Sequence, residues 1–308
     1  MSALVPEAFS AMVTGREPEP HVSGDEWLMG LPGLVEESLA EWDLTLDGEP
    51  MHGMAALVLP VRRRDDSLAV MKVTWPHVEA EHEHLALQHW GGHGAVRLLA
   101  ANPGRWTMLL ERLNGGRDLH EVPIDEACLV IGGLLRQLDH PALPQLSRLS
   151  AEVARMGEQF GSGPPAIPRR FVEQAHALMS DLVTDDVIDS RMVHTDLHYW
   201  NVLAADRQPW LAIDPKPLAA DPAFAVTPAL WNRWEEAIAS GDIRRHLRRR
   251  LSVICESAGL DEERARSWSI VREVQMGLWA VKDDDVGEVT KAIAIIKAMQ
   301  PDLSLIHI

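Results

Sequence analysis

The sequence predicts an α+β protein with two lobes, a small antiparallel sheet with one helix followed by a larger and mainly helical part. Its 308 residues exceed the usual size of one compact domain, and a hydrophobic fraction of 46% is enough for two cores. Short apolar runs dominate up to about residue 113, and helical spacing dominates after it. We therefore expect an N-terminal lobe over 1–113 and a helical lobe over 114–302. The apolar tail 303–308 does not resemble a folded element and could be non-native.

The N-terminal lobe is expected to open with a helix and continue as a sheet. A helix is predicted over 31–42, where apolar residues recur at helical spacing, and Asp47-Gly48 then signals a turn. Two apolar runs over 56–61 and 67–73, joined by a charged turn, predict a β-hairpin.

One further helix and two strands complete this lobe. The helix is predicted over 77–90, with Glu79, Glu83 and Trp90 on one face and Gly91-Gly92 after its end. Two more strands are expected in the remaining apolar runs, over 96–100 and 106–113.

The second lobe is predicted to be helical because the apolar period changes after Asn114. Helices are expected over 128–138, 149–160, 168–182, 231–239, 244–258, 261–280 and 287–299, and short strands over 191–194, 202–204 and 210–213.

Composition narrows the class of partner. Lys and Arg number 29 against 46 Asp and Glu, and a formal net charge of −17 repels nucleic acid and anionic lipid while it attracts cations. No apolar run is long enough for a membrane span, so we expect a cytoplasmic protein without membrane, nucleic-acid or protein partners. Cys128 and Cys255 lie far apart, which predicts two buried thiols rather than a disulfide or a zinc site.

The strongest motif runs from His194 to Asn201, with the sequence HTDLHYWN, and Asp214 follows thirteen residues later in IDP. Phosphoryl transfer requires a carboxylate that orients and deprotonates the acceptor hydroxyl, and two oxygen ligands that hold Mg²⁺ on the phosphates. Asp196 suits the first role, and Asn201 and Asp214 suit the second. The Asp-to-Asn spacing matches that of the catalytic loop of protein kinases.

Two other interpretations of this motif are open at the sequence level. His194, Asp196 and His198 alternate along the chain and could be the ligands of a metal cluster. The segment could also be a solvated polar loop without a chemical role.

Lys72, in the strand sequence AVMK, is a second and independent signal. It resembles the strand lysine of kinases that contacts the nucleotide phosphates and a helix glutamate. A lysine in an apolar strand is costly unless its ammonium has a partner. We expect Glu83 to be that partner, with Glu79 one turn away as the alternative.

The turn after the last strand of the first lobe predicts the adenine site. Adenine presents a neighbouring donor and acceptor, which the carbonyl of Glu111 and the N–H of Leu113 can satisfy. The loop around Gly53 is the candidate for phosphate contact through backbone amides, although it lacks the usual glycine-rich spacing.

With these motifs, the chain resembles the aminoglycoside/hydroxyurea phosphotransferases, closest to their streptomycin 6-kinase branch. The resemblance extends from about Trp27 to Lys282, and it is most specific in the Asp196 loop and in the segment containing Asp214. It implies a protein-kinase-like fold, ATP or GTP with Mg²⁺, and phosphorylation of a hydroxyl on streptomycin, with antibiotic resistance as the result.

The chain departs from the family pattern at three positions. Thr195 replaces the Gly or Trp often found in the loop, Ala225 replaces the acid of D-P-x-F-D, and Ala280 stands where relatives often have Asp. The last two positions bear on the substrate rather than on the phosphoryl transfer.

A cationic acceptor would need carboxylates beside an aromatic wall. The candidates are Trp279 with Asp283, and Glu235 near Trp231 and Trp234. The competing interpretation is that these are core tryptophans and solvated charges. Two other functions stay open: the same chemistry on hydroxyurea or a peptide antibiotic, and a nucleotide-binding regulator without turnover.

Overall fold

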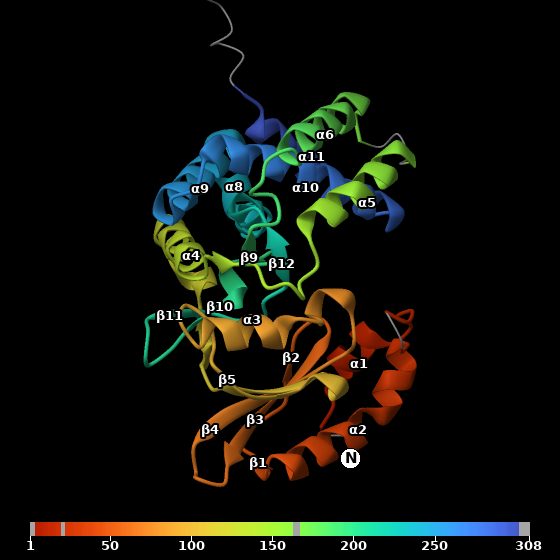
Figure 1. The fold of residues 1–308 in the computed structure, drawn as a ribbon, viewed down its shortest axis with the longest axis vertical. Helices are drawn as coiled ribbons and strands as arrows, with labels where there is room; N and C mark the ends of the chain where they lie inside the picture. Colours follow the sequence, from red (N-terminus) through yellow and green to blue (C-terminus); the bar gives the residue numbers. More distant parts are fainter. Residues whose placement is uncertain (1–3, 20–21, 163–166, 302–308) are drawn as a thin grey trace, which may run out of the picture. The chain divides into compact units, whose positions relative to one another are not determined.

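The computed structural model describes residues 4–19, 22–162 and 167–301 (Figure 1). The predicted tail 303–308 lies outside these residues. The chain forms two compact units. The first unit comprises the chain up to residue 115 together with 205–216, and the second comprises 116–204 and the chain from 217 onward. The first is built on a sheet and the second on helices, which confirms the predicted α+β class.

The first unit is built on an antiparallel sheet with the strand order β1-β3-β4-β6-β5, in which β2 pairs with β3. The predicted hairpin is β3 and β4, and the two other predicted strands are β5 and β6. The sequence did not predict β1 and β2, which are too short to show a period. The strands are β1 Leu44–Leu46, β2 Met51–His52, β3 Ala56–Arg63, β4 Leu68–Thr74, β5 Leu98–Asn102 and β6 Thr107–Glu111.

Two helices cover one face of this sheet, α1 (Glu7–Val13) and α2 (Gly24–Glu41). They form a single core with alternate residues of β3 and β4, including Met71 and Val73. Because side chains alternate along a strand, Lys72 points to the opposite face.

The predicted first helix, 31–42, was wrong at its start. Helix α2 begins at Gly24, capped by the side chain of Ser23, and it includes Pro32. Proline normally interrupts a helix because it lacks the N–H group. Here Trp27, Leu31 and Val35 recur every four residues and bury one face of the helix, which outweighs the missing hydrogen bond.

The helix predicted over 77–90 was also wrong at its start. A short 3₁₀ turn, η1 (Val78–Ala80), comes first, and α3 begins only at Glu83 and ends at Trp90. Glu79 lies in this turn, where its carboxylate pairs with Lys216 at 3.1 Å. The two glutamates therefore do not share a helix face.

The second unit packs its helices around α10, which contacts α6, α9 and α11. The predicted helices are present with shifted ends, except that 231–239 is interrupted at Arg233, whose φ is 54°. The guanidinium of Arg233 donates to the carbonyls of Leu119 and Val122. The helices are α4 Ile124–Gln137, α5 Leu149–Ser162, α6 Arg169–Leu182, α7 Pro228–Trp231, α8 Trp234–Ala239, α9 Ile243–Ala258, α10 Glu262–Lys282 and α11 Val286–Met299.

Short strands and 3₁₀ turns complete the chain. In the second unit, β9 pairs antiparallel with both β8 and β12. The elements are β7 Asn114–Asp118, β8 His140–Pro141, β9 Arg191–His194, β10 Val202–Ala204, β11 Trp210–Ala212, β12 Pro217–Ala220, η2 Pro103–Arg105, η3 Leu119–Glu121, η4 Tyr199–Asn201 and η5 Pro222–Val226. Within the described ranges, no helix has the length and apolar character that a bilayer crossing requires.

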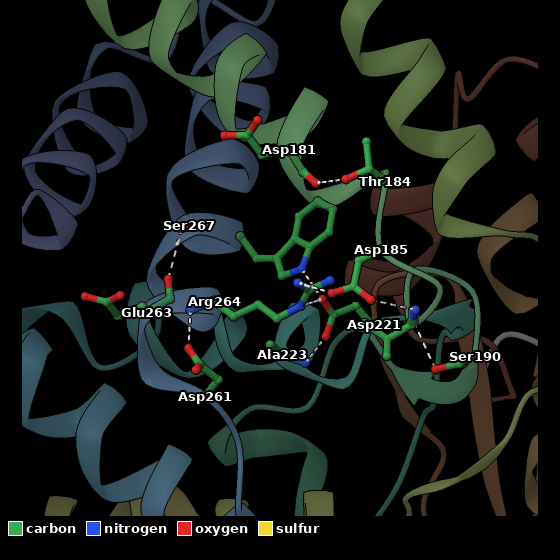
Figure 2. A network of polar contacts seen from close by, with 12 residues as sticks. Asp181, Thr184, Asp185, Ser190, Asp221, Ala223, Asp261, Glu263, Arg264 and Ser267 are labelled. Atoms are coloured by element: carbon green, nitrogen blue, oxygen red, sulfur yellow. Dashed lines mark hydrogen bonds and ion pairs between the residues drawn. The ribbon is translucent and has the colours of Figure 1, made fainter.

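Asp221 is the buried anchor of η5 (Figure 2). One carboxylate oxygen accepts from the N–H of Ala223 at 2.9 Å, and the other accepts from the indole of Trp268 at 2.6 Å and pairs with Arg264. Arg264 also reaches Asp185 at 3.0 Å. This network fastens the first turns of α10 to the segment Asp221–Ala225, so Asp221 has a structural role here.

Both cysteines are buried, as predicted. Burial raises the pKa of the Cys128 thiol to about 11 and that of the Cys255 thiol to about 12. Both thiols therefore stay protonated at neutral pH, which makes them poor nucleophiles.

Glu273 on α10 is a buried carboxylate with an incomplete set of partners. It is 1% exposed, and its Oε1 has no hydrogen-bond partner among residues 4–19, 22–162 and 167–301. Burial raises the pKa of Glu273 to about 8, although the charges of Arg272 and Lys291 oppose the shift. The folded chain therefore favours the neutral acid.

A raised pKa in the folded state gives a stability contribution that is complete below the unfolded value of about 4.5 and is lost as the pH rises through about 8. Glu273→Gln should therefore gain free energy of unfolding relative to the parent as the pH rises, by up to about 1.4 kcal/mol per pH unit. Urea unfolding at several pH values measures this difference. Glu256→Gln, an exposed change on α9, is the control. A difference between Glu273→Gln and parent that does not vary with pH would contradict the assignment.

Candidate active site

The centre of the first unit's site is the ammonium of Lys72. It lies on β4, is 7% exposed, and donates to both carboxylate oxygens of Glu83 at 2.6 and 2.7 Å. It also pairs with Asp214, which is 142 residues away in the sequence. The expected partner of Lys72 is therefore Glu83 and not Glu79.

Burial and charge act in opposite directions on this cluster. Burial acts to lower the pKa of Lys72, but the charges of Asp214 and Glu83 outweigh it and raise that pKa. Burial, with the charge of Asp214, raises the pKa of Glu83 to about 7 against the opposing effect of Lys72. The lysine is thus a fixed cation, because two carboxylates compete for one ammonium.

Asp214 is the accessible member of the cluster. Its side chain is half exposed, whereas that of Glu83 is buried. Its φ of 52° is a left-handed conformation that non-glycine residues adopt only at some cost. Asp214 is therefore the member of the cluster that solvent reaches.

The segment that carries Asp214 is fixed to the first unit by Arg207. The Arg207 guanidinium donates to the carboxylate of Glu111 from Nε, at 2.9 and 3.0 Å, and from Nη2, at 2.5 Å. It also donates to the carbonyls of Gly92 and Ala95. Two backbone hydrogen bonds join Ala212 to Gly94 and Val96. The sequence did not predict the role of Arg207, because an arginine in a polar turn carries no local signal.

Glu111 therefore has a structural role through its side chain. Burial acts to raise the pKa of this carboxyl, but the hydrogen bonds from Arg207 and from the N–H of Arg97 have the opposite and larger combined effect. The pKa of Glu111 is therefore lowered overall. The predicted adenine contacts use backbone atoms of Glu111 and Leu113, and they stay predictions.

Gly53 lies in the turn between β2 and β3. Its N–H donates to the carbonyl of Ala56 at 2.9 Å, and Arg16 binds the carbonyl of the neighbouring Met54. A phosphate would have to compete with the Gly53 hydrogen bond. The contact of this loop with a nucleotide stays a prediction.

In the second unit, the loop 194–201, which the sequence predicts to be the catalytic loop, is ordered by its own polar groups. The N–H of Asp196 donates to Nδ1 of His194 at 3.2 Å. The amide of Asn201 donates to the carbonyl of Asp196 at 3.0 Å and lies 3.1 Å from Nε2 of His198. The Asn201 amide nitrogen is therefore engaged within the loop.

Neighbouring elements hold the loop from outside. The guanidinium of Arg272 on α10 donates to the carbonyls of Thr195 and Phe224 at 3.0 Å, and it lies over the Phe224 and Trp231 rings. The buried hydroxyl of Tyr199 donates to the carbonyl of Ala229 at 3.0 Å. The peptide before Asp196 is thereby fixed.

The structure decides against the two other interpretations of the 194–201 segment, a metal cluster and a solvated loop. In the part of the chain that the structure describes, no group of three or more His, Cys, Asp or Glu side chains could hold a metal ion, so the His194–Asp196–His198 cluster was wrong. A solvated loop was also wrong, because His194 and Tyr199 are buried and Asn201 is nearly so.

The predicted acceptor residues lie on helices of the second unit. Glu235 is exposed on α8. Trp279 is 45% exposed on α10, and Asp283 is the residue after its last turn. Trp279 lies seven residues after Arg272, so it returns to the same face of α10 two turns further along. Their contact with an acceptor stays a prediction.

The two alanine departures occupy buried positions. Ala225 is 1% exposed and Ala280 is 8% exposed. A carboxylate at position 225 would be surrounded by packed side chains, so its absence bears on packing more than on a solvent-filled site.

The sequence profile of the aminoglycoside/hydroxyurea antibiotic resistance kinases matches residues 41–284 of the chain. The chain belongs to this family. It is a kinase, a phosphotransferase with a hydroxyl acceptor, and the resemblance inferred from its motifs is confirmed.

Three relatives show how far the similarity of this kinase extends. It is 41% identical to streptomycin 6-kinase of Streptomyces glaucescens over 285 residues, 90% of this chain and 92% of the relative. It is 40% identical to streptomycin 6-kinase of Streptomyces griseus, over 90% and 91% of the two chains. It is 39% identical to hydroxyurea phosphotransferase of Kitasatospora aureofaciens, over 90% and 81%.

Solved structures share the fold of this kinase. Aminoglycoside phosphotransferase APH(4)-Ia aligns with a TM-score of 0.58 at 14% identity, over 88% of this chain and 100% of that chain. Choline kinase LicA from Streptococcus pneumoniae aligns with a TM-score of 0.57 at 14% identity, over 87% and 98%. The predicted protein-kinase-like fold is confirmed.

The two glutamates offer a matched pair of variants. Glu83→Gln should weaken nucleotide binding about tenfold, since a hydrogen bond to a charged group contributes roughly 1.5–3 kcal/mol and Lys72 would be left to Asp214. Glu79→Gln should change it by less than about threefold, because it removes an exposed ion pair. Calorimetric titration with ATP measures both affinities. A larger loss in Glu79→Gln than in Glu83→Gln would contradict the assignment.

Proposed function

We propose that this kinase transfers the γ-phosphoryl group of ATP or GTP to a hydroxyl of streptomycin and thereby inactivates the antibiotic in the cytoplasm. The observation that carries the proposal is about 40% identity to two streptomycin 6-kinases over nearly the whole chain. The N-terminal lobe, 1–113, would bind the nucleotide, and the helical lobe, 114–302, would contribute the catalytic loop and the acceptor site.

The nucleotide contacts follow from the cluster in the first unit. Lys72 would bind the phosphates, because its ammonium is charged and its direction is fixed by Glu83. The carbonyl of Glu111 and the N–H of Leu113 would read the adenine edge. The Gly53 loop would cover the phosphates.

Asn201 and Asp214 fit a magnesium ion because both offer hard oxygen donors. The Asn201 amide nitrogen is engaged within its loop, and the Asp214 carboxylate is half exposed. A bound Mg²⁺ would neutralise charge on the phosphates. Asp214 would then have to share its charge between Lys72 and the ion.

Asp196 would act on the acceptor. Its backbone is fixed on both sides, by His194 at its N–H and by Asn201 at its carbonyl, so the point from which the side chain starts is defined. A carboxylate there would orient the acceptor hydroxyl and take its proton as the phosphorus–oxygen bond forms.

Hydroxyurea is the second candidate acceptor, favoured by 39% identity to a hydroxyurea phosphotransferase. The two candidates differ in charge, because streptomycin is a cation and hydroxyurea is neutral. The net charge of −17 and the candidates Glu235, Trp279 and Asp283 support the cation. A nucleotide-binding regulator is the remaining candidate, and the retention of Lys72 and Asp196 argues against it.

Acceptor-dependent release of ADP and GDP tests the function. Streptomycin should stimulate release in the parent, and Asp196→Asn should reduce turnover by about 10²–10⁴-fold with little change in nucleotide affinity. The apparent affinity for streptomycin should fall as salt rises to about 0.5 M, since screening shortens to a few ångströms. Stimulation by hydroxyurea alone would favour the second candidate. Release unaffected by any acceptor, or near-normal turnover of Asp196→Asn, would contradict the proposal.

A further inference from the structure

Trp200 is an exposed aromatic side chain inside the catalytic loop. It lies directly before Asn201 in η4, and it is 44% exposed. The other aromatic residue of this turn, Tyr199, is fully buried, and its hydroxyl fixes the loop by donating to the carbonyl of Ala229. Packing of the loop therefore accounts for Tyr199, but it does not account for the exposed surface of Trp200.

Two histidines hold the Trp200 ring in place. His120 stacks on it with a centroid distance of 4.7 Å and an interplanar angle of 15°, and His198 meets it edge-on at 5.9 Å and 77°. The backbone of His120 is itself fixed, because its main-chain N–H donates to the carboxylate of Asp118 at 2.7 Å. A ring clamped in this way keeps one orientation without a bound ligand.

The Trp200 ring is close to the catalytic carboxylate. One side chain, that of His198, separates the two groups: its ring contacts Trp200, and its Nε2 lies 3.8 Å from Oδ1 of Asp196. A molecule that touches the exposed surface of Trp200 is therefore within reach of Asp196.

The surroundings of Trp200 favour a cation. The face of an indole ring is negative and attracts cations, guanidinium groups above all. The carboxylate of Glu121, which is 92% exposed, lies 3.7 Å from Nδ1 of the stacked His120. Phosphate groups would be repelled by both features, so the nucleotide is not the expected occupant.

We propose that Trp200 is a specificity-determining residue that stacks on a guanidinium group of the acceptor while its hydroxyl is at Asp196. The inference rests on the proposed function and adds to it the residue that recognises the charge of the acceptor. The sequence analysis placed the aromatic wall at Trp279 instead, so the two tryptophans are alternatives with nearly equal exposure, 44% and 45%.

The test compares Trp200→Leu, Trp200→Phe and Trp279→Leu with the parent. Trp200→Leu should raise the KM and the calorimetric Kd for streptomycin about 3- to 30-fold, the range of a cation–π contact from exposed to desolvated sites. Trp200→Phe keeps a ring and should show a smaller rise. The KM for ATP should stay within about twofold in both, and Tm shows whether the variants fold.

The outcomes separate this inference from the proposed function. If the parent binds streptomycin but does not phosphorylate it, the proposed function fails and the Kd series still tests Trp200. If the parent does not bind streptomycin, both fail. An unchanged streptomycin Kd in folded Trp200→Leu, or an equal rise in its KM for ATP, overturns the role of Trp200. A rise of the streptomycin Kd in Trp279→Leu, without one in Trp200→Leu, would overturn the role of Trp200 and indicate Trp279 as the aromatic contact.

Discussion

A lysine ammonium buried at a sheet surface is stable only when carboxylates surround it, and in this kinase the requirement organises the first unit. The charge of Lys72 is balanced by Glu83 from α3 and by Asp214 from a segment 142 residues further along the chain. Removal of one partner from a buried ion pair is strongly destabilising. Both α3 and the 205–216 segment must therefore lie against the same face of the sheet.

The other contacts of the first unit serve this arrangement. Arg207 fixes the 205–216 segment to the end of β6, and α2 fills the opposite face of the sheet, so that Lys72 can point only toward α3. In the second unit, the catalytic loop is fixed in a similar way by Arg272 and Tyr199. Each unit thus carries functional groups whose directions are set before any substrate binds, which lowers the entropic cost of ordering them.

The sequence predicted those features of the fold that have a local signal. The β3–β4 hairpin and most helices of the second unit follow from apolar period. Asp196, Asn201 and Lys72 were proposed as site residues from spacing and from the cost of a buried charge, and those roles stay predictions. The start of α2 was missed because the prediction began at Leu31, whereas the helix extends back to Gly24, where Trp27 is buried in a long-range core that local spacing does not show. The contacts of Arg207, and the stacking of His120 on Trp200, join residues 96 and 80 positions apart in the sequence. Local patterns carry no information on such pairs.

The nucleotide affinity of Lys72→Met tests the central claim most directly. Methionine retains most of the length and the apolar stem of the side chain and removes the ammonium with its charge and its hydrogen-bond donors. Calorimetric titration with ATP and Mg²⁺ should show at least a tenfold weaker affinity than in the parent, since a charge-assisted contact to phosphate contributes roughly 1.5–3 kcal/mol. A folded Lys72→Met variant that binds ATP as tightly as the parent would contradict the account.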